Sequence, residues 1–328
     1  MVQEQLLSVE GLKTYCITRA GVVKAVDDVS FSVNCGDALG IVGESGSGKS
    51  MTCNSIVRLT PQPAGRIVAG KIMFEGSDIL QMTELEMRRI RGKKIAMILQ
   101  DPLMSLNPVY TIGNQVAESF KLHGERLGRA AVRQNVIRVL TQVNIPSVSQ
   151  RLKDYPFQFS GGMRQRTVAA MALAGNPSLL IADEPTTSLD VTIQDQFLRL
   201  LREMQKQAQM GLILVTHDLG IVAETCNRVA IMYAGKIVEI GGIWEIFESP
   251  AHPYTEALLQ ALPTLGNRSK RLFQITGDPP NLLDLPEGCA FQPRCHQLGK
   301  MCREGYPPMV PLGTERQAAC WRLVKGEG

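Results

Sequence analysis

The sequence predicts an α/β fold with a parallel sheet at its centre, and three observations support this. Four near-continuous apolar runs each end in a glycine or a polar residue: Asp37–Gly43, Lys94–Gln100, Ser178–Glu184 and Gly211–His217. Continuous hydrophobicity is typical of strands buried on both faces, as in a parallel sheet flanked by helices. The first run leads through a glycine-rich loop into a helical stretch, residues 51–59. With 44% hydrophobic and 20% charged residues, the chain of 328 residues has the composition of a globular protein with a real core.

The other elements follow in chain order. Residues 5–35 and 66–80 alternate between apolar and polar side chains, which predicts an antiparallel sheet packed to one side. Residues 101–165 contain no further strand of the buried type and have a helical pattern, most clearly at 114–122 and 128–143. An inserted helical subdomain is therefore expected between about residues 101 and 165.

The last part of the chain differs in composition from the rest. After about Leu262 the apolar strand and helix patterns fade, and prolines and four cysteines take over. This shift predicts a domain boundary, with one domain at residues 1–262 and a small C-terminal extension at 263–328.

Charge and targeting signals exclude several function classes. The chain has 35 basic and 31 acidic residues, and no stretch has the clustered basic footprint of a nucleic-acid binder. Its N-terminus lacks the basic and apolar regions of a signal peptide, and no run approaches the roughly 18 apolar residues of a membrane span. We therefore expect a soluble, cytosolic chain without disulfides. The scattered cysteines are interpreted as small buried hydrophobes: Cys16, Cys35, Cys53 and Cys226.

Residues 43–50 match the phosphate-binding pattern G-x-x-x-x-G-K-S between a strand and a helix. The glycines let backbone N–H groups wrap a phosphate chain, and the helix N-terminus adds favourable charge. Lys49 is expected to reach the β and γ phosphates, and the Ser50 hydroxyl to ligate Mg²⁺. The nucleotide-binding residues predicted here are Gly43, Glu44, Ser45, Gly46, Ser47, Gly48, Lys49 and Ser50.

Asp183 and Glu184 end a second buried strand and supply the carboxylates that such a site needs. Asp183 is placed to hold Mg²⁺ directly or through water, and Glu184 to polarise the attacking water as general base. The alternative is that two acids merely end a strand at the solvent edge, which a neighbouring phosphate loop makes less favoured.

The segment Ser160-Gly-Gly-Met-Arg-Gln-Arg166 resembles the signature motif of ATP-binding-cassette (ABC) ATPases. This resemblance implies a P-loop NTPase core with an antiparallel β subdomain and a helical subdomain. It implies ATP contacts from Ser160, Gly161 and Gly162, although Met163 stands where the family usually has Gln, and Phe159 where it has Leu.

Other family elements occur in order along the chain. Gln100 resembles the Q-loop glutamine, which acts in catalysis and contacts Mg²⁺. Asp190, within Ser188-Leu-Asp190, resembles the D-loop, and His217 resembles the switch histidine that contacts the γ-phosphate. Tyr15 resembles the aromatic residue that stacks on adenine, although a lone Tyr in a strand is as often core packing.

Longer segments of the sequence resemble one subgroup of the ABC ATPases. "QDPLMSLNP" (100–108), "ADEPTTSLDVTIQ" (182–194), "MYAGKIVEIG" and "HPYTEALL" (252–259) resemble the ATPase subunits of oligopeptide, dipeptide and nickel importers. This implies an ATP-hydrolysing motor at the cytoplasmic face of the inner membrane. Its implied partners are a second, related ATPase chain, two integral membrane permeases and an extracytoplasmic substrate-binding protein. Two rival classes remain. Cassette ATPases of DNA repair or translation usually have a second cassette or a coiled-coil insertion, and neither is present here. An exporter ATPase is the other rival, against which the segment "HPYTEALL" and the cysteine-bearing tail argue.

The remaining cysteines have the spacing C-x5-C-x6-C-x17-C: Cys289, Cys295, Cys302 and Cys320. A small region with few apolar residues usually needs a staple, and thiolates suit both zinc and iron–sulfur clusters. Structural zinc sites usually contain a tight C-x₂₋₄-C pair, which this pattern lacks. The resemblance to peptide-importer ATPases, whose tails can carry a [4Fe–4S] cluster, favours the cluster over Zn²⁺, with a structural or regulatory role. The cofactors expected are thus ATP, Mg²⁺ and a [4Fe–4S] cluster, with zinc as the alternative to the cluster.

Overall fold

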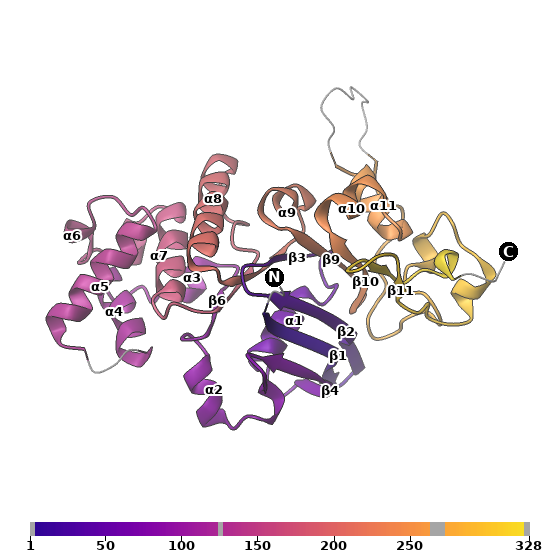
Figure 1. Ribbon diagram of the computed structural model, residues 1–328, viewed down its shortest axis with the longest axis horizontal. Helices are drawn as coiled ribbons and strands as arrows, with labels where there is room; N and C mark the ends of the chain where they lie inside the picture. The colour runs from indigo at the N-terminus through magenta and orange to yellow at the C-terminus, as the bar shows by residue number, and fades with distance from the viewer. Residues whose placement is uncertain (1–3, 124–126, 263–272, 325–328) are drawn as a thin grey trace. The chain divides into compact units, whose positions relative to one another are not determined.

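The computed structural model describes residues 4–123, 127–262 and 273–324 (Figure 1). The chain forms two compact units, each described here by itself. Unit 1 comprises the N-terminal residues to Leu6, Val33–Asp37 and Gln81–Val215. Unit 2 comprises Leu7–Ser32, Ala38–Leu80 and the chain from Thr216 onward. The predicted boundary near residue 262 falls beside residues 263–272, which lie outside the described residues.

Unit 1 contains three parallel strands in the order β6 (Ile95–Ile98), β7 (Leu179–Asp183) and β8 (Gly211–Thr216). Every residue of β7 and β8 is buried, as their continuous apolar sequence predicts. Parallel pairing aligns the carboxyl ends of these strands, so the residues that follow them gather at one edge of the sheet. The α/β fold class predicted from the sequence is confirmed.

Helices make up most of the rest of unit 1 (Figure 1). They are α2 (Glu84–Ile90), α3 (Pro102–Ser105), α4 (Ile112–His123), α5 (Arg129–Gln142), α6 (Val148–Arg151), the 3₁₀ turn η2 (Pro156–Gln158), α7 (Gly161–Leu173) and α8 (Val191–Ala208). Helices α4, α5 and α7 pack on one another through buried residues such as Val116, Val136 and Val168. The helical segment expected after Gln100 is therefore present, and α4 and α5 match its two clearest patterns.

Unit 2 contains the antiparallel sheet that alternation predicts. Its strands are β1 (Gln5–Thr18, whose first two residues belong to unit 1), β2 (Gly21–Asn34, whose last two residues belong to unit 1), β4 (Gly65–Phe74) and β5 (Ser77–Asp78), in the order β2-β1-β4-β5. In β1 and β4 the partners Leu7 and Phe74 are both fully buried, so one face of the sheet contributes to the core.

Unit 2 also contains β3 (Ala38–Val42), which pairs in parallel with β9 (Arg228–Tyr233), and β10 (Lys236–Gly242), antiparallel to β9. Its other elements are α1 (Lys49–Ile56), η1 (Ile79–Gln81, whose last residue belongs to unit 1), α9 (Leu219–Thr225), α10 (Ile243–Glu248), α11 (Pro253–Gln260), η3 (Gln292–Arg294), η4 (Lys300–Arg303), β11 (Val310–Pro311), β12 (Gln317–Ala318) and η5 (Trp321–Leu323). None of the described helices is both long and apolar enough to span a bilayer.

The C-terminal tail joins this second group of strands. β12 pairs antiparallel with β10, placing Ala318 opposite Glu239. The fully buried Glu239 carboxylate accepts hydrogen bonds from the backbone N–H groups of Ala251 and His252, both at 2.9 Å, and from Arg316 Nη2 at 3.1 Å. The sequence pattern missed β12 because it has only two residues and pairs with β10, which lies far earlier in the chain.

The four scattered cysteines do not share one environment. Cys53 and Cys226 are buried, as predicted. Cys16 is half-buried, and Cys35 is exposed, so the prediction is wrong for Cys35. Cys35 lies in the turn between β2 and β3, where its backbone N–H donates to the carbonyl of Glu4 at 3.1 Å. None of the eight cysteines, all of them in the described part of the chain, forms a disulfide.

Candidate functional site

The loop between β3 and α1 has the shape of a phosphate cradle. A Cβ atom on Gly43 would collide with the carbonyl oxygen of Met232, and one on Gly48 with the carbonyl oxygen of Ala25. Gly48 also has a φ of 104°, which side-chain-bearing residues rarely adopt. These two glycines are therefore required for the loop to fold tightly back to the N-terminus of α1.

Lys49 is the first residue of α1 and is only 5% exposed. Its Nζ donates hydrogen bonds to the carbonyl oxygens of Gly43 at 2.7 Å and Glu44 at 2.9 Å. Ser47 Oγ is buried and has no hydrogen-bond partner in the structure. A buried ammonium group, an unpaired hydroxyl and a helix N-terminus converge on this loop, and all three suit an anionic ligand. The donor set fits a nucleotide's phosphate chain.

A cavity of about 340 Å³ lies beside this loop. One wall is formed by Glu44 to Ser47, and another by Val23, Tyr233 and Ala234. The third wall comes from the C-terminal tail, at residues 279–282. No local sequence pattern predicts that the tail reaches the phosphate loop.

Tyr15 lies on β1 of the same unit and is half-buried. Its hydroxyl donates a hydrogen bond to Asp27 Oδ1 at 2.8 Å, and Asp27 is also paired with Lys236 at 3.0 Å. Burial and the bond to Asp27 raise the pKa of Tyr15 to about 12, so its hydroxyl stays protonated. The ring is held in place through its hydroxyl, and its role toward adenine stays a prediction.

In unit 1, the structure brings Gln100 and Glu184 together. Gln100 Nε2 donates to Glu184 Oε2 at 3.0 Å, and Thr187 Oγ1 donates to the same oxygen at 3.1 Å. Asp183, the last residue of β7, is buried. The parallel pairing of β6 and β7 explains why residues far apart in sequence meet at this edge of the sheet.

Glu184 has an unusual backbone conformation. Its φ is 44°, in the left-handed region, and its N–H donates to the carbonyl of Val215 at 2.9 Å. Such a conformation costs on the order of 1–3 kcal/mol in a non-glycine residue and persists where surrounding contacts enforce it. Strain of this kind gathers at functional sites, which supports a special role for this carboxylate.

The signature residues lie at the start of α7, also in unit 1. Ser160 is its N-cap and accepts a hydrogen bond from the Met163 N–H at 3.4 Å. A Cβ on Gly162 would come within 2.5 Å of Ile193 on α8, whereas one on Gly161 would meet Leu189 at an ordinary 3.7 Å. Asp190 caps α8 by accepting from the Ile193 N–H at 3.0 Å.

The predicted residues are divided between the two units. Unit 1 carries Gln100, Ser160, Gly161, Gly162, Asp183, Glu184 and Asp190, and unit 2 carries Tyr15, the loop 43–50, His217 and the four tail cysteines. His217 is exposed and directly follows β8; the next residue, Asp218, caps α9 by accepting from Gly220 N at 2.7 Å.

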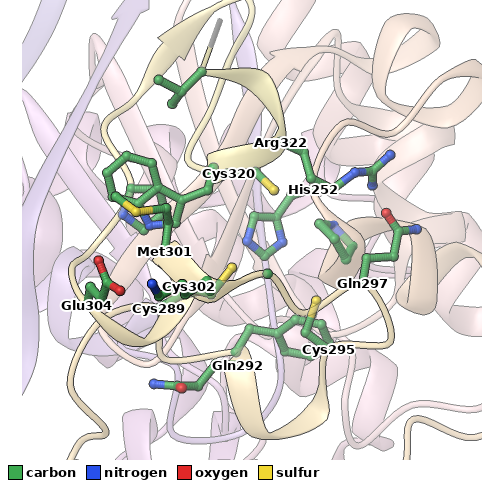
Figure 2. Close-up of a pocket in the computed structure, with 17 residues that line it drawn as sticks. His252, Cys289, Gln292, Cys295, Gln297, Met301, Cys302, Glu304, Cys320 and Arg322 are labelled. Atoms are coloured by element: carbon green, nitrogen blue, oxygen red, sulfur yellow. The ribbon is translucent and has the colours of Figure 1, made fainter. Parts of the chain in front are cut away.

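The four tail cysteines line one cavity of about 460 Å³ (Figure 2). The backbone holds two of them together, because the Cys289 N–H donates to the carbonyl of Cys302 at 2.9 Å. Burial raises the pKa of Cys289 to about 11, with smaller contributions from the other three thiols, and burial also raises the pKa values of Cys295 and Cys320. Among the described residues, no group of three or more His, Cys, Asp or Glu side chains is arranged to hold a metal ion.

His252 and Tyr254 were not assigned a role from the sequence, although both lie in the quoted segment "HPYTEALL". His252 lines the cysteine cavity, and its Nδ1 accepts from the Tyr254 N–H at 3.0 Å (Figure 2). Full burial lowers the pKa of His252 to about 3, so the imidazole is neutral at physiological pH. Tyr254 Oη accepts from the backbone N–H of Glu44 at 3.0 Å, which connects this segment to the phosphate loop.

Two family models match the chain. Residues 26–187 match the model described as "ABC transporter", and residues 238–302 the model described as "Oligopeptide/dipeptide transporter, C-terminal region".

Curated relatives match nearly the whole length. The chain is 46% identical to the dipeptide transport ATP-binding protein DppD of Bacillus subtilis, over 97% of this chain and 95% of that protein. It is equally identical to the oligopeptide transport ATP-binding protein OppD of the same organism (97% and 89%) and to DppD of Escherichia coli (96% of each).

Solved structures agree on the fold. The ATP-binding cassette MJ0796, solved as a dimer bound to ADP and Pi, is similar with a TM-score of 0.65 at 22% identity, over 73% of this chain and 99% of that one. CbiO1 of Clostridium perfringens, part of the ABC transporter complex cbiONQ, is similar with a TM-score of 0.63 at 25% identity, over 75% and 92%. The matched relatives span the phosphate loop, the signature segment and the tail. The chain therefore belongs to the ABC ATPases of the oligopeptide and dipeptide transporter family.

Proposed function

We propose that this chain is the ATP-hydrolysing subunit of an importer for oligopeptides or dipeptides. The observation that carries the proposal is the phosphate cradle at Gly43–Ser50. Its buried Lys49 and its unpaired Ser47 Oγ are suited to bind an anion. Relatives named for dipeptide and oligopeptide transport match the chain almost from end to end, tail included, which supports the substrate class.

Each site residue has a proposed part in hydrolysis. Lys49 neutralises the β and γ phosphates, Glu184 orients and deprotonates the attacking water, and His217 contacts the γ-phosphate. Ser50, Gln100 and Asp183 would hold Mg²⁺, which supplies positive charge to the phosphates when bound. Tyr15 stacks on adenine, and the signature residues with Asp190 cover the nucleotide of a facing cassette: Ser160, Gly161 and Gly162.

ATP binding is proposed to close two cassettes head to tail, and hydrolysis to release them. The facing cassette is a related, non-identical chain, and movement passes to two membrane permeases served by an extracytoplasmic binding protein. The chain acts from the cytoplasmic face of the inner membrane and binds no nucleic acid. In this proposal the motor is residues 1–262, with a helical subdomain at about 101–165, and residues 263–328 form the peptide-importer extension.

Five large apolar side chains exposed near Gln100 support docking to a permease. They all lie in unit 1, between the end of β6 and the start of α4: Leu99, Leu103, Met104, Val109 and Tyr110, of which Met104 is 82% exposed. Large apolar side chains gathered on a surface mark interaction sites. We call these five residues the apolar surface.

Leu103→Glu is expected to reduce co-purification of the chain with its permeases by about tenfold, the effect of one charge placed in a packed interface. Leu85→Glu is the matched control, because Leu85 is an equally exposed leucine on α2 (63% against 56%). Pull-down from solubilised membranes measures the difference. Equal recovery of permeases with both variants would exclude this surface as the docking site.

We also propose that Cys289, Cys295, Cys302 and Cys320 hold a [4Fe–4S] cluster. All four line one cavity, and the other three thiols lie close enough to Cys289 to contribute to its raised pKa. A single zinc ion needs four sulfurs at about 2.3 Å from one point, whereas a cluster needs four around a larger volume. The cavity of about 460 Å³ has room for a group larger than a single ion, which supports the cluster.

Anaerobically purified protein is therefore expected to be brown and to contain about four iron and four sulfide per chain, as the cluster's composition requires. Metal analysis and the visible absorption spectrum measure this. Cys295→Ser should lower the iron content, while Cys35→Ser, at an exposed cysteine outside the cavity, should not. A colourless protein with one zinc and no sulfide would contradict the cluster.

A further inference from the structure

Arg294 connects the cysteine-bearing tail to the phosphate loop. It is the last residue of η3, directly before Cys295, and its side chain is only 4% exposed. Its Nη1 lies 2.7 Å from Glu44 Oε2, and its Nη2 lies 3.0 Å from Glu44 Oε1. This is a two-pronged pairing of guanidinium and carboxylate, the strongest and most directional kind of ion pair in proteins.

Glu44 is the second residue of the phosphate loop and is held at three points. Arg294 fixes its carboxylate, Tyr254 Oη accepts from its N–H at 3.0 Å, and its carbonyl accepts from Lys49 Nζ at 2.9 Å. Any shift of Glu44 would move the carbonyl that positions Lys49. The ion pair therefore bears directly on the group that neutralises the nucleotide's phosphates.

The charge of Glu44 matters as well as its position. A carboxylate within an anion-binding loop repels phosphate, and at 25% exposure water screens it only in part. Arg294 neutralises this charge from outside the loop. Without Arg294, the loop would present an unpaired negative charge beside the phosphates.

The other side of Arg294 is anchored in the tail. Its Nε donates to the carbonyl of Thr276 at 3.2 Å, and Phe291, three residues earlier, is buried against Tyr233 and Tyr254 with ring centroids 5.3 Å apart in both cases. The Cys295 N–H closes the same 3₁₀ turn by donating to Gln292 at 3.3 Å. The turn that presents Arg294 thus ends at a cysteine of the cavity.

We propose that Arg294 is a positioning residue of the phosphate loop. Through Arg294, the affinity for nucleotide depends on the conformation of residues 289–302, here called the cysteine segment. The proposal rests on ATP binding at residues 43–50, and it assigns to the tail a regulatory role toward the nucleotide.

The test is the dissociation constant of Mg-ATP for the full-length chain, measured by calorimetry. Arg294→Ala should raise it about tenfold, at the lower end of couplings between sites. Arg303→Ala is the matched control, because Arg303 also neighbours a cavity cysteine, Cys302, but is exposed. Arg303→Ala should bind as the unchanged protein does. Arg294→Lys keeps the positive charge but loses the two-pronged hydrogen bonding to Glu44, so it should give a smaller rise in the dissociation constant. It replaces Arg294→Ala in the test if that variant is insoluble.

Two outcomes overturn the positioning role. If Arg294→Ala lowers the Tm but keeps the original dissociation constant, the ion pair stabilises the fold and does not affect nucleotide affinity. If the effects of Arg294→Ala and Glu44→Ala on that constant are additive in the double variant, Arg294 does not act through Glu44. A separate failure, normal ATP binding by Lys49→Ala, would instead refute the phosphate loop as the nucleotide site.

Cys295→Ser tests the link to the cysteines. It should raise the dissociation constant in the otherwise unchanged protein and add nothing to Arg294→Ala, since both changes act on the same turn. An unchanged dissociation constant in Cys295→Ser would overturn the dependence on the cysteine segment.

Discussion

Glu184→Gln is expected to lower ATP hydrolysis by about 10²–10⁴-fold while leaving ATP binding intact, because the amide cannot accept the proton of the attacking water. The substitution preserves size, and the neighbouring amide of Gln100 and hydroxyl of Thr187 are uncharged. The backbone conformation at φ 44° should also tolerate it, since Gln and Glu have the same Cβ geometry. Steady-state hydrolysis and nucleotide binding, measured on a complex in which only this site is active, separate the two effects.

Glu203→Gln is the matched control for this experiment. Glu203 is an exposed carboxylate on α8 of the same unit. The Glu203→Gln variant should therefore hydrolyse ATP at the original rate. Near-normal turnover by Glu184→Gln would remove Glu184 from the role of general base.

Gly161→Leu is expected to lower hydrolysis by the assembled transporter by about 10²–10³-fold, the usual effect of losing one donor to the transferring phosphoryl group. A side chain at this position would obstruct the nucleotide of the facing cassette. Binding of ATP by the isolated subunit should stay unchanged, because the residue serves its partner's nucleotide. Position 161 suits the test, since an added Cβ makes only an ordinary contact with Leu189, whereas one at Gly162 would press on Ile193.

Lys49→Ala provides the contrast for this variant. If isolated Gly161→Leu loses ATP affinity as severely as isolated Lys49→Ala, the signature segment acts on its own chain's nucleotide. The head-to-tail arrangement would then be wrong for this protein.

Local sequence patterns predicted the strands and the phosphate loop well, because each depends on neighbouring residues. Continuous apolar runs gave β3, β6, β7 and β8 within a few residues, since burial on both faces leaves no polar position. The glycines at 43 and 48 were recognisable because a tight loop excludes Cβ atoms there.

The contacts that connect the tail to the core could not be predicted in this way. Arg294 and Glu44 are 250 positions apart, and nothing local marks either as the other's partner. β12 has only two residues, too few to show a periodicity of its own, and it pairs with β10 and β11. The positive φ of Glu184 accompanies a hydrogen bond to Val215 in a neighbouring strand, and local sequence does not mark a glutamate for this conformation.

ATP-driven peptide uptake tests the central claim most directly. The chain would be reconstituted in proteoliposomes with its companion ATPase, its two permeases and the substrate-binding protein, and supplied with a radiolabelled dipeptide or oligopeptide. We predict uptake that requires ATP on the side of the ATPase subunits and that falls with Glu184→Gln in parallel with hydrolysis. Hydrolysis that continues without peptide uptake, and that no peptide-loaded binding protein stimulates, would contradict the assignment as a peptide importer's motor.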